Sequence, residues 1–169
     1  MTQSDIFKQA KGAYLALMRP ARDGSEFSMG IDTLIALAPD VPVDVVSSML
    51  AGASWRERLL GLCIAMTQTA QPARYIDSMV QSLRDPRGLS TVPACAALAL
   101  LARRGVFTMT ESFGDTIDRS PFHGEVGWGI DKALHFVGIR AEDAPGDGGP
   151  NDGQVFEAHV QFYDSLHAD

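Results

Sequence analysis

Apolar residues recur at helical spacing along almost the whole chain, and this pattern predicts an all-α fold. The first expected helix covers residues 5–19, and its apolar face consists of Ile6, Ala10, Ala13, Tyr14 and Leu17. Further helices are expected over 27–38, from Pro42 to Gly52, from Ser54 to Met66, from Pro72 to Leu83, over 91–104, from Thr108 to Ile117, from Ser120-Pro121 to Val137 and over 154–167. No segment alternates long enough to predict a strand. We therefore expect roughly seven to nine helices and no sheet.

Local signals mark several helix ends. Ser54 with Glu57, and Thr108 with Glu111, match the capping box, in which each side chain satisfies the other residue's backbone amide. Gly105 follows the 91–104 helix and suits its C-terminal cap. That helix is apolar on all sides, which is typical of a central, buried helix.

A repeat of 36 residues connects the central helices. Leu62, Leu98 and Leu134 share this spacing, as do the small residues Gly61, Ala97 and Ala133 and the set Ala65, Leu101 and Val137. The helices that follow also share a set of four corresponding positions. These are Ile76, Met79, Val80 and Leu83 in the first of them, Phe113, Thr116, Ile117 and Ser120 in the second, and Phe156, His159, Val160 and Tyr163 in the last. The pattern predicts stacked antiparallel helix pairs, which bury a core only by stacking. The alternative is that unrelated amphipathic helices share the spacing by chance.

Part of this pattern resembles the HEAT and armadillo-like superfamily of αα-repeats. The resemblance rests on Leu83-Arg84-Asp85-Pro86-Arg87-Gly88, followed by Val92-Pro93-Ala94-Cys95-Ala96-Ala97-Leu98-Ala99-Leu100-Leu101, and on Trp55-Arg56-Glu57-Arg58-Leu59-Leu60. It covers residues 54–139 and departs from the family pattern at Pro93, where an arginine often stands. The resemblance implies a helical superhelix whose second helices line a concave face that binds a partner.

The length of 169 residues suits a single domain over 1–169. Within it we expect N-terminal helices over 1–53, the best repeats over 54–139, an exposed Gly/Pro/Asp-rich loop over 140–153 and a C-terminal helix over 154–169. No apolar run is long enough to span a membrane, and the first residues contain no signal-peptide core. We therefore expect a cytoplasmic protein with no membrane partner.

The cysteine content and the charge distribution indicate the state of the thiols and the class of partner. Cys63 and Cys95 lie among apolar neighbours and are expected to be buried free thiols, with a disulfide or a reactive thiol as the alternative. The net charge of −7 is uneven, because residues 106–169 hold three Lys/Arg and twelve Asp/Glu. This acidic third repels nucleic acid and favours either a basic partner or a solvated surface.

The residues of common catalytic and metal sites do not occur at the required spacings. His123, His135, His159 and His167 have no metal-ligand spacing, and His123-Gly124-Glu125 lacks the downstream Pro-Cys-x-x-Cys of a zinc deaminase. Asp147, Asn151 and Asp152 can hold calcium only weakly, and a solvated loop is the alternative. A Cys–His pair can form only through tertiary contacts. We expect no enzyme activity, no cofactor and no metal.

Two acidic stripes are the candidate partner-binding residues. They comprise Glu111, Asp115 and Asp118 on one expected helix and Glu157 and Asp164 on the last helix. Helical spacing places these carboxylates opposite Phe113, Ile117, Phe156 and Val160, so they are expected to face outward. The alternative is a solvated face. Trp55 and Trp128 are expected to plug the ends of the stack, or else to be exposed partner anchors.

These features favour a non-enzymatic protein-binding module whose acidic surface binds a basic protein. Its concrete form is an immunity-type inhibitor of a toxin that acts in the cytoplasm, by analogy with small acidic helical inhibitors. A general scaffold or adaptor is the alternative, and a HEAT-like DNA glycosylase is a third. The glycosylase requires a basic groove, for which Arg56, Arg58, Arg74, Arg84 and Arg87 are the candidates. The sequence does not set the oligomeric state.

Nucleic-acid binding separates the glycosylase from the protein-binding hypotheses. We expect no sub-micromolar binding to DNA or RNA at physiological salt, because the acidic third repels phosphates. Fluorescence anisotropy with labelled oligonucleotides measures this. Tight, salt-sensitive DNA binding that is lost when Arg84 and Arg87 are replaced would overturn the expectation and favour the glycosylase.

Overall fold

The computed structural model describes residues 1–10, 12–18, 25–68, 71–83, 89–115, 124–144 and 152–166. Over these ranges the chain forms nine α-helices, three short 3-10 helices and no strand, which confirms the all-α prediction. The α-helices are α1 (Gln3–Gln9), α2 (Ala13–Leu17), α3 (Ser25–Leu37), α4 (Val43–Leu50), α5 (Trp55–Thr67), α6 (Ile76–Ser82), α7 (Thr91–Arg103), α8 (Gly124–Phe136) and α9 (Asp152–Ser165). The 3-10 helices are η1 (Ala38–Asp40), η2 (Pro72–Tyr75) and η3 (Glu111–Gly114).

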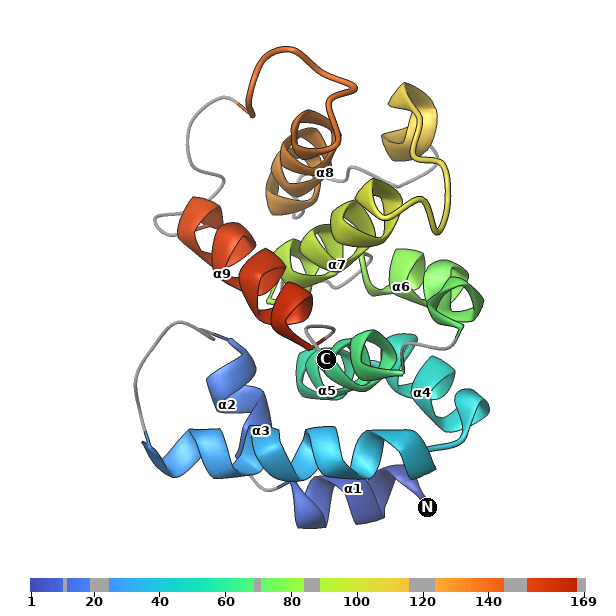
Figure 1. Cartoon of the computed structure of the whole chain (residues 1–169), viewed down its shortest axis with the longest axis vertical. Coiled ribbons are helices and arrows are strands. Elements are labelled where there is room, and N and C mark those ends of the chain that lie inside the picture. Colours follow the sequence, from blue (N-terminus) through green and yellow to red (C-terminus); the bar gives the residue numbers. More distant parts are fainter. Residues whose placement is uncertain are drawn as a thin grey trace.

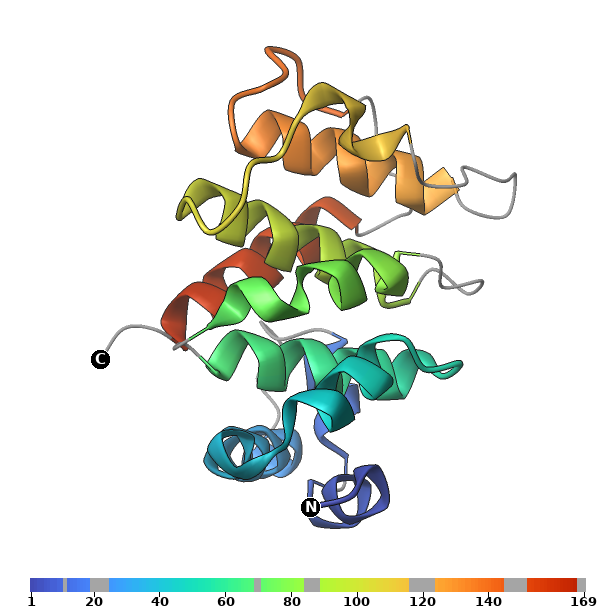
Figure 2. The same ribbon diagram turned by 90° about the vertical axis from the view of Figure 1, so that its right-hand side faces the viewer.

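Helices α5, α7 and α8 stack as a central column (Figures 1 and 2). Helices α4 and α6 and the short η3 lie along one side of this column, and α9 crosses its other side. Helices α1 and α3 close the end of the stack beyond α5, and α2 packs between α3 and α5. The column is therefore covered on both sides, which explains why its helices are apolar around most of their circumference.

Helix α7 is the most enclosed helix of the column. Every residue from Thr91 to Leu101 is buried, because α5, α6, α8 and α9 all pack on this helix. Its end follows the prediction: Gly105 has a φ of 73°, and the amide of Val106 donates to the carbonyl of Leu101 at 3.0 Å. This bond closes a Schellman-type cap in the left-handed conformation that glycine adopts without strain.

The three leucines of the 36-residue repeat occupy the central column. Leu62 of α5, Leu98 of α7 and Leu134 of α8 are fully buried, as predicted. Small residues allow the neighbouring helices to approach closely. A Cβ at Gly61 would lie 3.1 Å from Cβ of Met49 in α4, and one at Gly129 would lie 2.9 Å from Sγ of Cys95 in α7.

The pairing of the last helix differs from the prediction. The outer helices precede their inner partners along the chain, so that α4 packs on α5, α6 on α7 and η3 on α8. The C-terminal helix α9 does not form a third pair with α8, because it packs chiefly on α7. On this side of α7, Phe156 and Tyr163 of α9 are buried.

The N-terminal segment also differs from the prediction. The helix expected over 5–19 is interrupted and forms α1 and α2, because Gly12 has a φ of 86° and begins a new helix. The break turns α2 against α3, where a Cβ at Gly30 would lie 3.0 Å from the backbone nitrogen of Ala13.

Neither predicted capping box forms. Ser54 is the N-cap of α5, but its side chain makes no capping bond, and Glu57 lies instead against Gly52. No helix begins at Thr108, since the chain there forms only η3 after Thr110. The capping box among the described residues is at α1, where the amide of Asp5 donates to Oγ1 of Thr2 and that of Thr2 to the Asp5 carboxylate. The start expected at Ser120-Pro121 lies outside the described residues.

The enclosure of α7 predicts a large effect of truncating Leu98. Leu98→Ala should lower the free energy of unfolding by about 2–5 kcal/mol, because the site has little freedom to collapse around the lost methyl groups. Leu89, which is 41% exposed just before α7, is the matched control. Leu89→Ala should cost well under half as much in urea denaturation. Equal losses for the two variants would contradict the central position of α7.

Candidate functional site

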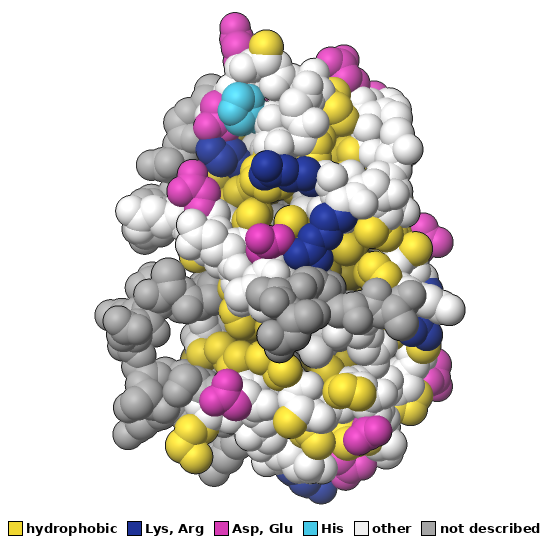
Figure 3. Space-filling view, viewed as in Figure 1, with side chains coloured by type: hydrophobic (Ala, Val, Ile, Leu, Met, Phe, Trp, Pro, Cys, Tyr) yellow, Lys and Arg dark blue, Asp and Glu magenta, His cyan; other side chains and the backbone are white. Residues whose placement is uncertain are grey.

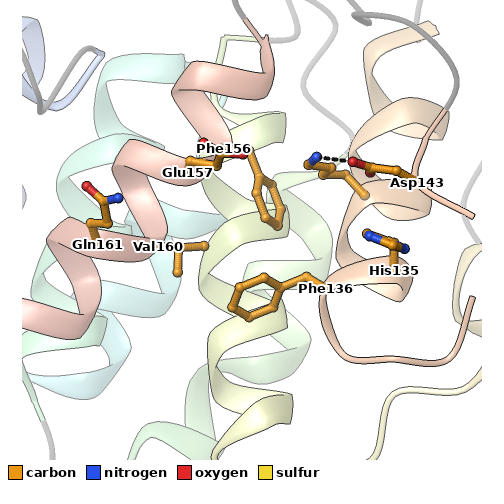
Figure 4. A pocket seen from close by; sticks show the side chains of 8 residues that line it. His135, Phe136, Asp143, Phe156, Glu157, Val160 and Gln161 are labelled. Atoms are coloured by element: carbon orange, nitrogen blue, oxygen red, sulfur yellow. Dashed lines mark hydrogen bonds and ion pairs between the residues drawn. The ribbon is translucent and has the colours of Figure 1, made fainter. Parts of the chain in front are cut away.

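An open hollow of about 470 Å³ lies between α8, α9 and the segment that follows α8 (Figure 4). Eight side chains line it: Lys132, His135, Phe136, Asp143, Phe156, Glu157, Val160 and Gln161. The hollow exists because both helices pack on α7 while diverging from each other. Its walls therefore come from regular helices and from a short segment tied back onto one of them.

The floor of the hollow is aromatic. The rings of Phe136 and Phe156 meet edge to face with their centroids 5.9 Å apart, and Val160 lies beside them (Figure 4). Phe156 is almost fully buried against α7, while Phe136 is partly exposed. The guanidinium of Arg103 at the end of α7 lies 5.0 Å from the Phe136 ring centroid and supports that ring by a cation–π contact.

The wall after α8 is fixed by polar contacts back to that helix. Asp131 pairs with Arg140, and Nδ1 of His135 donates to the carbonyl of Arg140 at 3.2 Å. Nζ of Lys132 lies 2.6 Å from Oδ2 of Asp143. The hydrogen bond from Lys132 lowers the pKa of the Asp143 carboxyl, and the amide of Ala144 contributes in the same direction. The wall thus keeps its shape without a ligand.

The rim is polar, and one of its carboxylates has no cation beside it. Lys132 and Asp143 neutralise each other, whereas exposed Glu157 forms no ion pair with any described residue. Figure 3 shows the apolar floor on this face surrounded by cationic and acidic side chains. The arrangement suits a ligand that combines an apolar group for the floor with a positive charge for Glu157.

The structure does not bring the two predicted acidic stripes together. Glu111 in η3 and Asp115 just after it are exposed on one side of the column, whereas Glu157 and Asp164 lie on α9 at the other side (Figures 1 and 2). Over the described residues 108–115 the expected helix is limited to the four residues of η3, so Glu111 and Asp115 do not lie on an α-helical face there. Asp118 lies outside the described residues.

The two carboxylates of α9 differ in their surroundings. Glu157 lines the hollow, while Oδ1 of Asp164 is 2.7 Å from Nη2 of Arg104 on α7. The Asp164 side chain is 65% exposed, so this ion pair contributes little to stability. Of the predicted acidic residues that the structure describes, Glu157 is therefore the one that lines the hollow.

Both tryptophans are buried and do not serve as exposed anchors. Trp55 and Trp128 are each 7% exposed. Trp55 packs edge to face on Tyr14 at 5.7 Å between centroids, with Arg56 over both rings. Their role is structural, which was the favoured expectation.

Sequence reasoning missed the aromatic floor of the hollow. The helical pattern predicts Phe156 in the core but does not single out its partly exposed neighbour Phe136. One signal pointed to Phe136: it is a large apolar residue that falls outside the buried stripe of Ile130, Ala133 and Leu134. An apolar side chain off the buried face of an amphipathic helix is a candidate contact residue.

The buried polar groups near α9 do not form a nucleophilic site. Tyr163 lies near Cys63 and against the ring of His159, at 5.6 Å between ring centroids. Both ring nitrogens of His159 face backbone carbonyls, those of Val155 and Leu17, rather than the Cys63 thiol. Burial raises the pKa of Cys63 to about 12 and that of Cys95 further still, which keeps both thiols protonated.

The described residues contain no group of three or more His, Cys, Asp or Glu side chains placed to hold a metal ion. No helix among them has the length and apolar character needed to cross a bilayer.

Comparison with known proteins found no matching family model, no matching curated protein and no matching solved structure.

Both cysteines are free and buried, as predicted, and this sets their reactivity. At pH 8 a thiol reagent such as DTNB should react with neither thiol of the native protein on the minute timescale, because the thiolate fraction is negligible. Two thiols should react at once in denaturant. Rapid native labelling, or a bridge in the mass spectrum of the unreduced protein, would contradict this.

Proposed function

We propose that this chain is a protein-binding module that holds its partner in the hollow between α8 and α9. The observation that carries the proposal is the free carboxylate of Glu157 beside the aromatic floor of Phe136 and Phe156. A site of this kind selects a partner side chain by charge and by apolar surface together. It offers both on rigid helices, so little conformational entropy is lost on binding.

The floor supplies affinity. Burial of one large apolar partner side chain contributes about 1.5–3 kcal/mol. Because the edge-to-face pair of Phe136 and Phe156 is already packed, the floor need not rearrange to accept it. An aromatic or long aliphatic partner residue fits best, since it can cover the exposed part of the Phe136 ring, which the buried Phe156 ring supports from behind.

The charge favours a basic partner. Residues 106–169 contain three Lys/Arg against twelve Asp/Glu, so a positively charged protein is attracted over a long range. On arrival a Lys or Arg beside the inserted apolar residue can pair with Glu157. Rim charges of this type raise the association rate more than they slow dissociation.

The narrower form of the proposal is an immunity-type inhibitor of a toxin that acts in the cytoplasm. A toxin that cleaves nucleic acid needs a basic surface to bind its substrate, and an acidic inhibitor can cover that surface. A scaffold would use the same hollow without blocking an activity. An activity assay of the purified partner, with and without the chain, distinguishes the two.

Site-specific photocrosslinking tests the location of the partner. A photoreactive residue in place of Gln161, which lines the hollow, should crosslink one protein in cells of the source organism. Gln81, an exposed glutamine on the opposite side of the column, is the matched control. The crosslink at position 161 should vanish with Glu157→Lys and persist with Glu157→Asp. Equal crosslinking at both positions would refute the hollow as the site.

Association kinetics with the captured partner test the charge argument. Glu157→Lys should slow association several-fold at low salt and flatten its salt dependence while leaving the melting temperature unchanged. Asp115→Lys makes the same charge change near η3 and should have the smaller effect. A larger effect of Asp115→Lys would move the partner surface to the η3 side.

A further inference from the structure

Arg103 borders the hollow at the end of the floor that Phe136 forms. It is the last residue of α7, and its guanidinium carbon lies 5.0 Å from the centroid of the Phe136 ring. Arg103 is exposed, and Phe136 is one of the residues that line the hollow. A partner side chain that covers the exposed part of this ring therefore lies next to the guanidinium.

The guanidinium of Arg103 keeps donors for a further partner. Its contact with Phe136 uses the positive charge but not all of its five N–H groups. The neighbouring Arg104 is 2.7 Å from Asp164, whereas no described carboxylate forms an ion pair with Arg103. The fork of N–H groups matches the two oxygens of a carboxylate, so an acidic group beside the ring can bind there.

A charge of the opposite sign lies at the other end of the floor. Figure 4 shows Glu157 beside Phe156, while Phe136 lies at the opposite end of the aromatic pair. The order across the floor is therefore carboxylate, aromatic rings, guanidinium. This order distinguishes the two ends of an occupant, because a reversed occupant places like charges together.

We propose that the hollow binds a surface segment of its protein partner that presents a Lys or Arg, a large apolar side chain and an Asp or Glu in this order. The basic group pairs with Glu157, the apolar group covers Phe136, and the acidic group binds the guanidinium of Arg103. Arg103 is therefore a specificity-determining residue of the hollow. The inference rests on the proposed function, since it requires a partner in the hollow, and it adds the acidic group and the direction of the segment.

The acidic group is a side-chain carboxylate rather than the end of a chain. Terminal carboxylates are captured by nests of backbone amides. The amides at the end of α7 are already used, because those of Gly105 and Val106 donate to the carbonyls of Ala102 and Leu101. The donors available to an anion at this end are thus those of the Arg103 side chain, which suit the carboxylate of Asp or Glu.

Selection from a random peptide display library on the full chain tests the proposal without a purified partner. Selected peptides should carry a basic and an acidic residue on opposite sides of an apolar residue. Selection on Arg103→Glu should replace the acidic residue by Lys or Arg, because the charge that it meets is reversed. Arg104→Glu makes the same charge change one position along and is the matched control, which should select the original pattern.

The affinity of one selected peptide measures the pairing with Arg103. Replacing the acidic residue of the peptide by its amide should weaken binding to the wild type about two- to fivefold, the range for an ion pair in contact with solvent. The same replacement should leave binding to Arg103→Gln unchanged. Melting temperatures show whether the variants fold, and if Arg103→Glu does not, the comparison with Arg103→Gln decides.

The outcomes separate this inference from the proposed function. Equal weakening with the wild type and Arg103→Gln, or selected peptides without an acidic residue, would overturn the role of Arg103 and leave the hollow as the partner site. Failure to enrich any peptide whose binding is lost with Glu157→Lys and with Phe136→Ala would overturn both.

Discussion

The burial of α7 is the interaction on which the rest of the structure depends. This helix has no solvated face over most of its length, so it is stable only while its neighbours cover it on every side. Neighbouring helices α5 and α8 extend the column, and α6 and α9 flank it. Helices α8 and α9 are amphipathic and α6 is short, so they gain their stability mainly from packing on the column rather than from their own propensity.

The hollow is a by-product of this arrangement. Helix α9 covers α7 instead of pairing with α8, so the surfaces of α8 and α9 that do not face α7 stay apart. Phe136 and Phe156 meet across the gap and form its floor, while Glu157 faces solvent one position further along α9. A third regular helix pair would have filled this space. The departure from the repeat pattern therefore creates the hollow that Glu157, a predicted acidic residue, lines.

The sequence predicts the parts of the fold that depend on local pattern. The burial of Leu62, Leu98 and Leu134 follows from apolar periodicity, and the end of α7 follows from the special conformation of Gly105. The position of α9 does not follow, because two sides of α7 are equally apolar and the sequence does not say which helix covers which. Tertiary packing determines which helix covers each side of α7.

The candidate site, too, can be predicted from local pattern only in part. Outward-facing Glu157 could be predicted from helical spacing, whereas its juxtaposition with Phe136 depends on how α8 and α9 diverge. Within the described residues, the acidic helix expected from Thr108 is limited to η3. The interruption at Gly12 also escaped prediction, because glycine is tolerated in many helices and only the contact with α3 explains the turn.

Nε2 of His159 on α9 lies 2.6 Å from the carbonyl oxygen of Leu17 on α2, although the two residues are 142 positions apart in the sequence. This separation bears on how the chain folds. During synthesis α7 emerges well before α9. The side of α7 that α9 covers therefore stays exposed while some fifty further residues are made. Non-local contacts of this kind raise contact order and slow folding. Until α9 has been made, this side of α7 has no cover from α9, and the contact between His159 and Leu17 can form only after α9 has emerged.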